Sequence, residues 1–226
     1  MLQWKFLGQA PYAEAWEMQR ELRERRIAGD IPDTILLLEH PPTITLGRLR
    51  GEESLRLTQT ELEERGVTVV RSDRGGDATL HAPGQLVGYL IVNLRERRLR
   101  LPDFVEGIAN VMIRYLNEKH DVSARYDSDF PGVWIDHNKI TAFGFHLKQD
   151  VTMHGFAMNL STDLSLFDLI VPCGLQNKGV ASLAQFVEES PSCEAMASVV
   201  VDGIADWFGT TTRTFQTQEH TALQSQ

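Results

Sequence analysis

The chain has 226 residues, of which 42% are hydrophobic and 23% charged, and its formal net charge is −9. This composition is ordinary for a globular protein and predicts one domain over residues 1–215, followed by a polar tail over residues 216–226. The acidic charge argues against nucleic acid as the main partner, because binding phosphate needs a basic surface.

The apolar runs of the chain have the length of strands, so we expect no membrane span. The N-terminus lacks the basic region and apolar stretch of a signal peptide, and the two cysteines stand in different contexts that do not suggest a disulfide. We therefore expect a cytoplasmic protein. No CxxC or HExxH spacing is present, so no metal site is predicted.

The first half of the chain alternates helical and strand patterns. Helices are predicted where apolar residues recur at helical spacing, and Thr58 and Gly66 are typical residues at the start and the stop of one of them. The predicted helices span residues 13–28 and 59–65, and the predicted strands span residues 33–39, 43–46, 67–71 and 85–94.

The second half begins with the clearest amphipathic pattern, a helix over residues 104–119. A polar turn at residues 136–138 then favours a hairpin between two strands. The remaining predictions are strands at 132–135 and 139–147, a pair of strands within 151–160, a helical turn at 165–167 and a helix at 194–207. Together these elements predict an α+β fold, with mixed β-sheets flanked by helices.

Cys173 stands in the segment Pro172-Cys173-Gly174. Proline holds the residue before it in an extended conformation, and glycine lets a substrate approach the backbone, so this segment favours a nucleophilic cysteine. The alternative is a buried structural cysteine, which is the commoner role of a free thiol. Cys193 lies in a polar stretch that we interpret as a loop without a function.

Three further stretches hold polar residues and glycines that a packed core would avoid. One is the glycine-rich segment 74–85, which indicates either a loop that approaches a ligand or an ordinary hairpin. The second begins at Lys139, whose side chain would by itself be expected to reach solvent. The third contains His154, which alone would be expected to be a hydrogen-bonded structural histidine.

Taken together, these segments resemble one family. The patterns RGGxxTxHxPGQ, KIxxxG, HGFAxN and PCG followed by VxSL occur here in this order, between residues 30 and 187. They are similar to those of the lipoyl(octanoyl) transferases. The chain departs from the family pattern at Leu80, where Tyr or Trp is more common, at Ala82, where Gly is more common, and at His146, where Arg is common.

The resemblance implies the α/β catalytic domain of biotin and lipoate protein ligases. It also implies transfer of an octanoyl group from octanoyl-acyl carrier protein, through a cysteine thioester, to a lysine of lipoyl domains. The acceptors would be 2-oxoacid dehydrogenase E2 subunits and the glycine cleavage H protein, and no cofactor would be needed. Cys173 would be the nucleophile and Lys139 its catalytic partner. The implied substrate-binding residues are Arg74, Gly75, Gly76, Asp77, Ala78, Thr79, Leu80, His81, Ala142, Phe143, Gly144, Gly155, Phe156 and Ala157.

The chemistry of these residues agrees with a transfer between thioesters. Free cysteine has a pKa of about 8.5, and a neighbouring ammonium such as that of Lys139 would favour the reactive thiolate. Two other readings stay open. The chain could be an ATP-dependent lipoate or biotin protein ligase, for which a nucleophilic cysteine is unnecessary, or a binding module without catalysis.

Charge is unevenly distributed along the chain. The segment 95–100 carries four arginines and one glutamate, against the net charge of the whole. Clusters of this kind are mostly solvated helix faces. The functional alternative is a landing site for an acidic carrier protein, because steering depends on the local potential.

Overall fold

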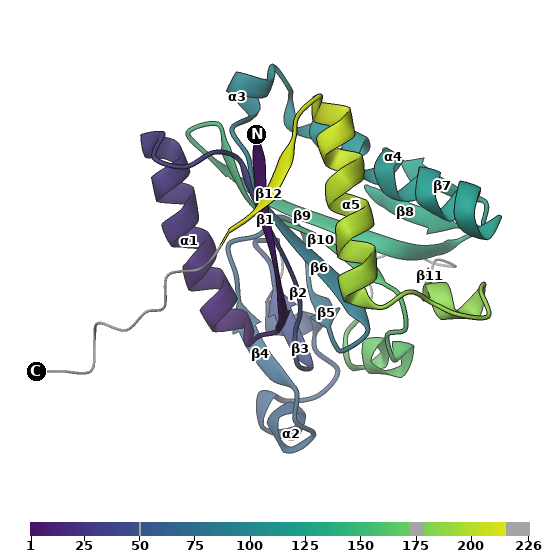
Figure 1. Ribbon diagram of the computed structural model, residues 1–226. Coiled ribbons are helices and arrows are strands. Elements are labelled where there is room, and N and C mark those ends of the chain that lie inside the picture. Colours follow the sequence, from purple (N-terminus) through teal and green to yellow (C-terminus); the bar gives the residue numbers. More distant parts are fainter. Residues whose placement is uncertain (50, 172–178, 216–226) are drawn as a thin grey trace, which may run out of the picture.

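The computed structural model describes residues 1–49, 51–171 and 179–215 (Figure 1). Its helices lie on the two faces of a large β-sheet, and a small second sheet lies beside it. The α-helices are α1 (Tyr12–Ala28), α2 (Gln59–Glu64), α3 (Leu94–Arg97), α4 (Leu101–His120) and α5 (Cys193–Phe208). Short 3₁₀ turns are η1 (Glu52–Ser54), η2 (Leu164–Leu169) and η3 (Leu183–Gln185).

The large sheet has the strand order β12-β1-β2-β6-β10-β9-β8-β7, with β11 paired to β9, and the small sheet has the order β4-β3-β5. Both sheets contain parallel and antiparallel pairs, so both are mixed, as predicted. The large sheet comprises β1 (Leu2–Gln9), β2 (Thr34–Glu39), β6 (Gln85–Ile91), β7 (Ala124–Asp127), β8 (Gly132–Ile135), β9 (Asn138–Lys148), β10 (Val151–Asn159), β11 (Gly179–Val180) and β12 (Thr212–Thr214). The small sheet comprises β3 (Thr43–Leu46), β4 (Thr68–Arg71) and β5 (Thr79–His81).

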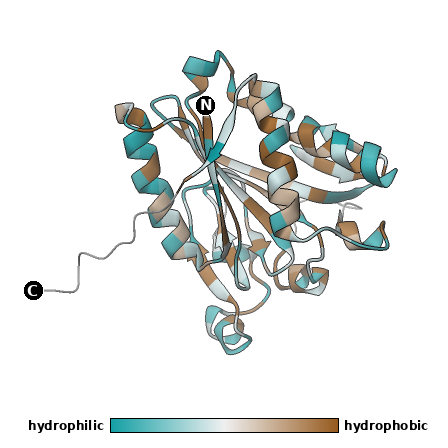
Figure 2. Cartoon of the chain, viewed as in Figure 1, coloured by the Kyte–Doolittle hydropathy of each residue, from teal (hydrophilic) through white to brown (hydrophobic). Residues whose placement is uncertain are grey.

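The main core lies between the large sheet and the pair α4 and α5. Phe104, Ile108, Met112 and Leu116 of α4 are fully buried, as the helical period of the sequence requires. Figure 2 shows that the helices differ in hydropathy: many apolar residues lie along α5, and polar residues lie along the outer side of α1. Helix α1 covers the other face of the sheet, above β6 and β10.

Several strands differ from the prediction: β1, β7, β11 and β12 were not expected, and β5 lies within the stretch predicted as a glycine-rich loop. In β1 the apolar residues Leu2, Trp4 and Phe6 alternate with Gln3 and Lys5, so the strand period was present in the sequence and was overlooked. The partners of β1 are β2 and β12. Residues 151–159 form one strand, where we expected a pair. Within this strand, a Cβ on Gly155 would meet the backbone of Gly88, so this glycine permits close contact between strands and makes no turn.

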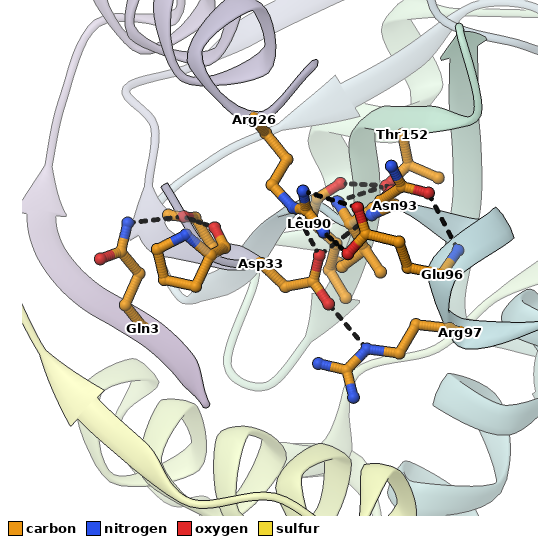
Figure 3. A network of polar contacts seen from close by, with 11 residues as sticks. Gln3, Arg26, Asp33, Leu90, Asn93, Glu96, Arg97 and Thr152 are labelled. Atoms are coloured by element: carbon orange, nitrogen blue, oxygen red, sulfur yellow. Dashed lines mark hydrogen bonds and ion pairs between the residues drawn. The ribbon is translucent and has the colours of Figure 1, made fainter. Parts of the chain in front are cut away.

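An ionic network joins α1, β2 and α3 at the end of the sheet (Figure 3). Asp33 is buried, and its carboxylate accepts hydrogen bonds from Arg26 Nε at 2.9 Å and from Arg97 Nε at 2.7 Å. Arg26 also forms an ion pair with Glu96. Arg97 is therefore part of the folded framework. No helix in the described part of the chain is long and apolar enough to cross a membrane.

Candidate active site

A cleft of about 380 Å³ opens between the two sheets. The small sheet supplies the glycine-rich loop and β5, the large sheet supplies β9 and β10, and η2 closes one side. A smaller cavity of about 50 Å³ shares five of these lining residues, namely Arg74, Thr79, Ala142, Phe143 and Ala157. The small cavity therefore adjoins the cleft and extends beneath α1, where Tyr12 and His154 line it.

The glycine-rich loop is anchored by a buried arginine. Arg74 donates from Nε to Thr45 Oγ1 at 2.9 Å, and from Nη2 to the Thr45 carbonyl oxygen at 2.6 Å. The same loop lies directly against β9. The N–H of Gly75 donates to the Phe145 carbonyl oxygen at 3.1 Å, and a Cβ on Gly144 would be 2.9 Å from the Gly75 oxygen. The contact therefore requires glycine at position 144.

Asp77 connects this loop to the chain that leads toward Cys173. Its Oδ1 accepts from Ser54 Oγ at 2.9 Å, and both side chains are buried. The backbone around Ser54 in turn pairs with the segment after η2. Val171 N–H donates to the Ser54 oxygen at 2.8 Å, and Arg56 N–H donates to the Leu169 oxygen at 3.0 Å.

Lys139 is the second residue of β9 and lines the cleft. Its Nζ donates to the Pro131 carbonyl oxygen at 3.2 Å and lies 4.9 Å from the ring centroid of Trp134. Cation–π contact with a buried tryptophan limits where this ammonium can move. The side chain is half-buried, unlike a lysine that extends freely into solvent.

Cys173 lies outside the described residues, as do all positions from 172 to 178. The described residues on either side both reach the cleft, since Ile170 and Gly179 line it. On the far side, β11 pairs in parallel with the start of β9, which places Val180 opposite Lys139. Ala181 N–H donates to the Lys139 carbonyl oxygen at 3.0 Å.

Two neutral histidines lie at the small cavity, where His81 lines the wall and His40 packs behind it against His81 and Tyr89. Complete burial lowers the pKa of His81 well below its usual value, and its Nδ1 lies 2.8 Å from Gln85 Oε1. Burial also lowers the pKa of His40 to about 4. His40 Nδ1 is 2.6 Å from the Ala10 carbonyl oxygen, which can only accept, so Nδ1 carries the proton. Its Nε2 then accepts from the Tyr89 hydroxyl at 2.6 Å.

Asp73 bridges two further histidines at the edge of the small cavity. Its carboxylate oxygens lie 2.8 Å from His154 Nε2 and 2.8 Å from His146 Nδ1. Burial alone would raise the pKa of Asp73, but the hydrogen bonds and charges of the two histidines outweigh it and lower that pKa. Burial lowers the pKa of His154, whose backbone adopts a φ of 62°. Such strained backbone is common near functional sites.

The structure brings together most of the residues that the resemblance implied. The cleft is lined by Arg74, Gly76, Asp77, Ala78, Thr79, Lys139, Ala142, Phe143 and Ala157. The small cavity adds His81, Gly144, Gly155 and Phe156. Leu80 lines neither, because alternate residues of β5 face opposite ways, and it packs in the core of the small sheet. Gly75 lines neither cavity, and its N–H donates a hydrogen bond to Phe145 of β9.

Sequence reasoning missed several residues of the site. Trp134, Gln85 and Asn159 line the cleft, and Gln85 Nε2 donates to Asn159 Oδ1 at 2.9 Å. Gln85 and Asn159 close two of the recognised patterns, so their position was the available signal. Tyr12, at the start of α1, lines the small cavity and is far from every motif, so nothing in the sequence indicated it.

Cys193 was interpreted wrongly as part of a polar loop. It is the first residue of α5, its side chain is buried in the main core, and Ser192 caps the helix. Burial, together with the neighbouring Glu39 carboxylate, raises the pKa of the Cys193 thiol to about 12. The thiol is therefore protonated at neutral pH and is a poor nucleophile. Over residues 1–49, 51–171 and 179–215, no group of three His, Cys, Asp or Glu side chains could hold a metal ion.

Comparison with known proteins decides the family. The model of the lipoyl protein ligase A/B catalytic domain matches residues 11–205. The curated octanoyltransferase of Alkaliphilus metalliredigens is 45% identical over 80% of this chain and 83% of its own length. That of Chloroflexus aggregans is 43% identical over 89% of this chain and 92% of its own. The chain belongs to the octanoyltransferase family.

Solved structures agree with the fold. The bipartite lipoate protein ligase of Thermoplasma acidophilum has a TM-score of 0.75 at 16% identity, with 96% of this chain and 87% of that chain covered. The biotin protein ligase of Aquifex aeolicus has a TM-score of 0.58 at 13% identity, with 92% of this chain and 70% of that chain covered. The expected ligase-like α+β fold is thereby confirmed.

Proposed function

We propose that this chain transfers an octanoyl group in two half-reactions, through a thioester on Cys173, with Lys139 moving the protons. As a member of the octanoyltransferase family, the chain is an acyltransferase of lipoate biosynthesis that acts in protein lipoylation. The cysteine, the lysine and the order of steps are the parts that we propose.

In the first half-reaction, the Cys173 thiolate attacks the thioester carbonyl of the octanoyl donor. The carbon–sulfur bond to the donor breaks, and the donor leaves as a thiol after it takes up a proton from the Lys139 ammonium. In the second, the amine of an acceptor lysine attacks the Cys173 thioester and gives up a proton to Lys139. An amide forms and Cys173 is released as a thiolate beside the Lys139 ammonium, so both groups return to their starting states and neither step consumes ATP.

The observation that carries this proposal is the pairing of β11 with β9. On one side of segment 172–178 Ile170 lines the cleft, and on the other Gly179 and Val180 line it, with Val180 paired to Lys139. The seven residues between Val171 and Gly179 include Cys173, and described residues on both sides of them line the same cleft as Lys139. A thiol and an ammonium within reach of each other suit acyl transfer.

The loop and the two strands suit the other needs of the reaction. The Gly75 N–H is bonded to Phe145, so of this glycine pair Gly76 is the candidate to stabilise the tetrahedral oxyanion. Ala142, Phe143 and Ala157 offer apolar surface to the acyl chain at the junction of the cleft and the small cavity. Each buried methylene would contribute about 0.8 kcal/mol.

The octanoyltransferase family implies an acyl carrier as donor and lipoyl domains as acceptors. A solved relative from Thermoplasma acidophilum is described together with its E2 lipoyl domain. For this chain we propose octanoyl-acyl carrier protein as the donor. We propose E2 subunits of 2-oxoacid dehydrogenases and the glycine cleavage H protein as acceptors. The reaction would take place in the cytoplasm.

A transfer assay without nucleotide tests the proposal. Purified chain, octanoyl-carrier protein and a lipoyl domain should yield the octanoylated domain in the absence of ATP, and Cys173→Ser should yield none. Free octanoate with ATP and magnesium should yield none with either protein. Product only under the second condition would identify an ATP-dependent ligase instead, and product under neither would favour a binding module.

A further inference from the structure

We propose that the rim formed by Arg48, Leu49 and Arg56 is the docking surface for an acidic carrier protein that delivers the acyl thioester. This inference rests on the proposed function, because it assumes a donor with a prosthetic arm that enters the cleft. The rim is defined here by these three residues, which belong to the segment between β3 and α2.

Hydrogen bonds fix the rim to the entrance of the cleft. The N–H of Arg48 donates to the Arg74 carbonyl oxygen and that of Leu49 donates to the Gly76 carbonyl oxygen, both at 3.2 Å. Arg56 lines the cleft itself, and its Nε donates to the Ile170 carbonyl oxygen at 3.3 Å. The rim therefore lies directly beside the glycine-rich loop that forms a wall of the substrate site.

The composition of the rim suits an acidic partner with an apolar contact. Leu49 is 77% exposed, the largest exposed fraction among the large hydrophobic residues that the structure describes. Arg48 and Arg56 are also exposed, and neither forms an ion pair with a carboxylate in the described part of the chain. Two such guanidinium groups beside an apolar side chain form a local basic surface that suits an acidic protein, although the net charge of the chain is −9.

The arginine cluster of segment 95–100 fits this role less well. Arg97 is committed to Asp33, and Arg100 to Asp103. The cluster also follows the far end of β6, whose first residue, Gln85, lines the cleft. Six residue steps of about 3.3 Å separate the two ends of that strand, so the cluster begins about 20 Å from the cleft.

The donor and the acceptor differ in how far their reacting group extends from the protein surface, and this difference assigns them to different docking surfaces. A carrier presents its thioester on a long prosthetic arm, so its surface can contact the rim while the thioester enters the cleft. An acceptor presents a single lysine side chain, so it has to contact the surface nearest Lys139. That surface includes Pro131, whose carbonyl oxygen binds Lys139 Nζ, and the exposed Phe130. The rim is therefore assigned to the carrier.

Steady-state kinetics with two donors test the assignment. Arg48→Glu and Leu49→Ser should each raise KM for octanoyl-carrier protein, the charge reversal by about fivefold or more, with kcat nearly unchanged. The increase of that KM with salt should be weaker in Arg48→Glu than in the wild type. Octanoyl-pantetheine, which lacks the protein, should be used equally well by all three. Arg95→Glu is the matched control, since it makes the same charge change in the far cluster.

Each other outcome overturns the proposal in a recognisable way. Equal losses with both donors would place Arg48 in the chemistry or the folding of the site. If the variants at Arg48 and Leu49 raised only the KM for the lipoyl domain, the rim would be the docking surface of the acceptor. A higher KM for octanoyl-carrier protein in Arg95→Glu but not in Arg48→Glu would assign carrier docking to the arginine cluster of segment 95–100. A wild-type chain that transfers octanoyl from neither donor would instead refute the proposed function itself.

Discussion

At the scale of residues, the surroundings of Lys139 distinguish a catalytic lysine from one that only extends into solvent. Its Nζ is held by the Pro131 carbonyl oxygen and the face of Trp134, and its backbone pairs with Val180. A lysine that served only solubility would not need this arrangement inside a cleft. The placement supports a role in tuning Cys173, which is open to direct measurement.

Removing the ammonium should slow alkylation of Cys173. In Lys139→Met the stem keeps a similar volume, so the fold should survive while the charge disappears. The thiol pKa should rise toward its unperturbed value of about 8.5, and each unit of that rise corresponds to about 1.4 kcal/mol. The rate of iodoacetamide labelling at pH 7 should therefore fall and recover as the pH is raised. Superimposable profiles for the variant and the wild type would refute this role of Lys139.

Cys193 gives little background in that measurement. Its thiol is buried and its pKa is raised to about 12, so it should react very slowly below pH 9. The variant Cys193→Ala therefore provides the matched control, with the labelling profile of the wild type. Fast labelling of Cys193 in the folded protein would show that α5 opens at its first turn.

The residue types of the site were largely predictable, and their individual orientations were not. The patterns named the loop, β9 and β10 correctly, because their glycines and polar residues do not suit a core. They could not show that Leu80 faces away from the site while Thr79 and His81 face toward it. That distinction depends on the register of β5 against β3, which is set by long-range pairing.

At the scale of elements, the contact between the glycine-rich loop and β9 sets the shape of the cleft. A Cβ at position 144 would be 2.9 Å from the Gly75 oxygen, too close for both backbones to stay in place. Gly144→Ala should therefore push the loop away from β9. We expect a loss of about 1–3 kcal/mol in the free energy of unfolding and at least a tenfold lower kcat/KM with octanoyl-pantetheine.

A second glycine separates the effect on the site from the loss of stability. Gly66 ends α2 with a φ of 74° and lines neither cavity. Gly66→Ala should lower the free energy of unfolding by about 1 kcal/mol through backbone strain alone and leave kcat/KM unchanged. Urea unfolding and steady-state kinetics on both variants check this. Equal losses of kcat/KM in Gly144→Ala and Gly66→Ala would mean that the contact between the loop and β9 has no special role in activity.

Local patterns predicted the long helices well and the edge strands poorly. Helices α1, α4 and α5 were found within two or three residues of their ends, and the capping box at Thr58 is present. The turn at residues 136–138 joins β8 and β9 as expected. Strands β7 and β12 were missed because short strands at a sheet edge carry little periodicity. Strand β1 was missed although Leu2, Trp4 and Phe6 alternate with polar residues.

At the scale of the whole molecule, the Asp33 network holds the end of the sheet together. Asp33→Asn removes the charge that pairs with both Arg26 and Arg97 and leaves these guanidinium groups partly uncompensated. We expect a loss of about 3–5 kcal/mol in the free energy of unfolding, measured by urea denaturation. Asp103→Asn breaks the exposed pair with Arg100 and should change stability little. A small effect at Asp33 would show that the network is not essential to the fold.

The central claim is a covalent octanoyl-enzyme on Cys173, and mass spectrometry tests it most directly. The chain is mixed with octanoyl-carrier protein without an acceptor, and its intact mass and peptides are then measured. The account predicts one added octanoyl group, located on the peptide that contains Cys173, absent from Cys173→Ser and removed when a lipoyl domain is added. An adduct on Cys193, or octanoylation of the lipoyl domain without any adduct on the chain, would contradict it.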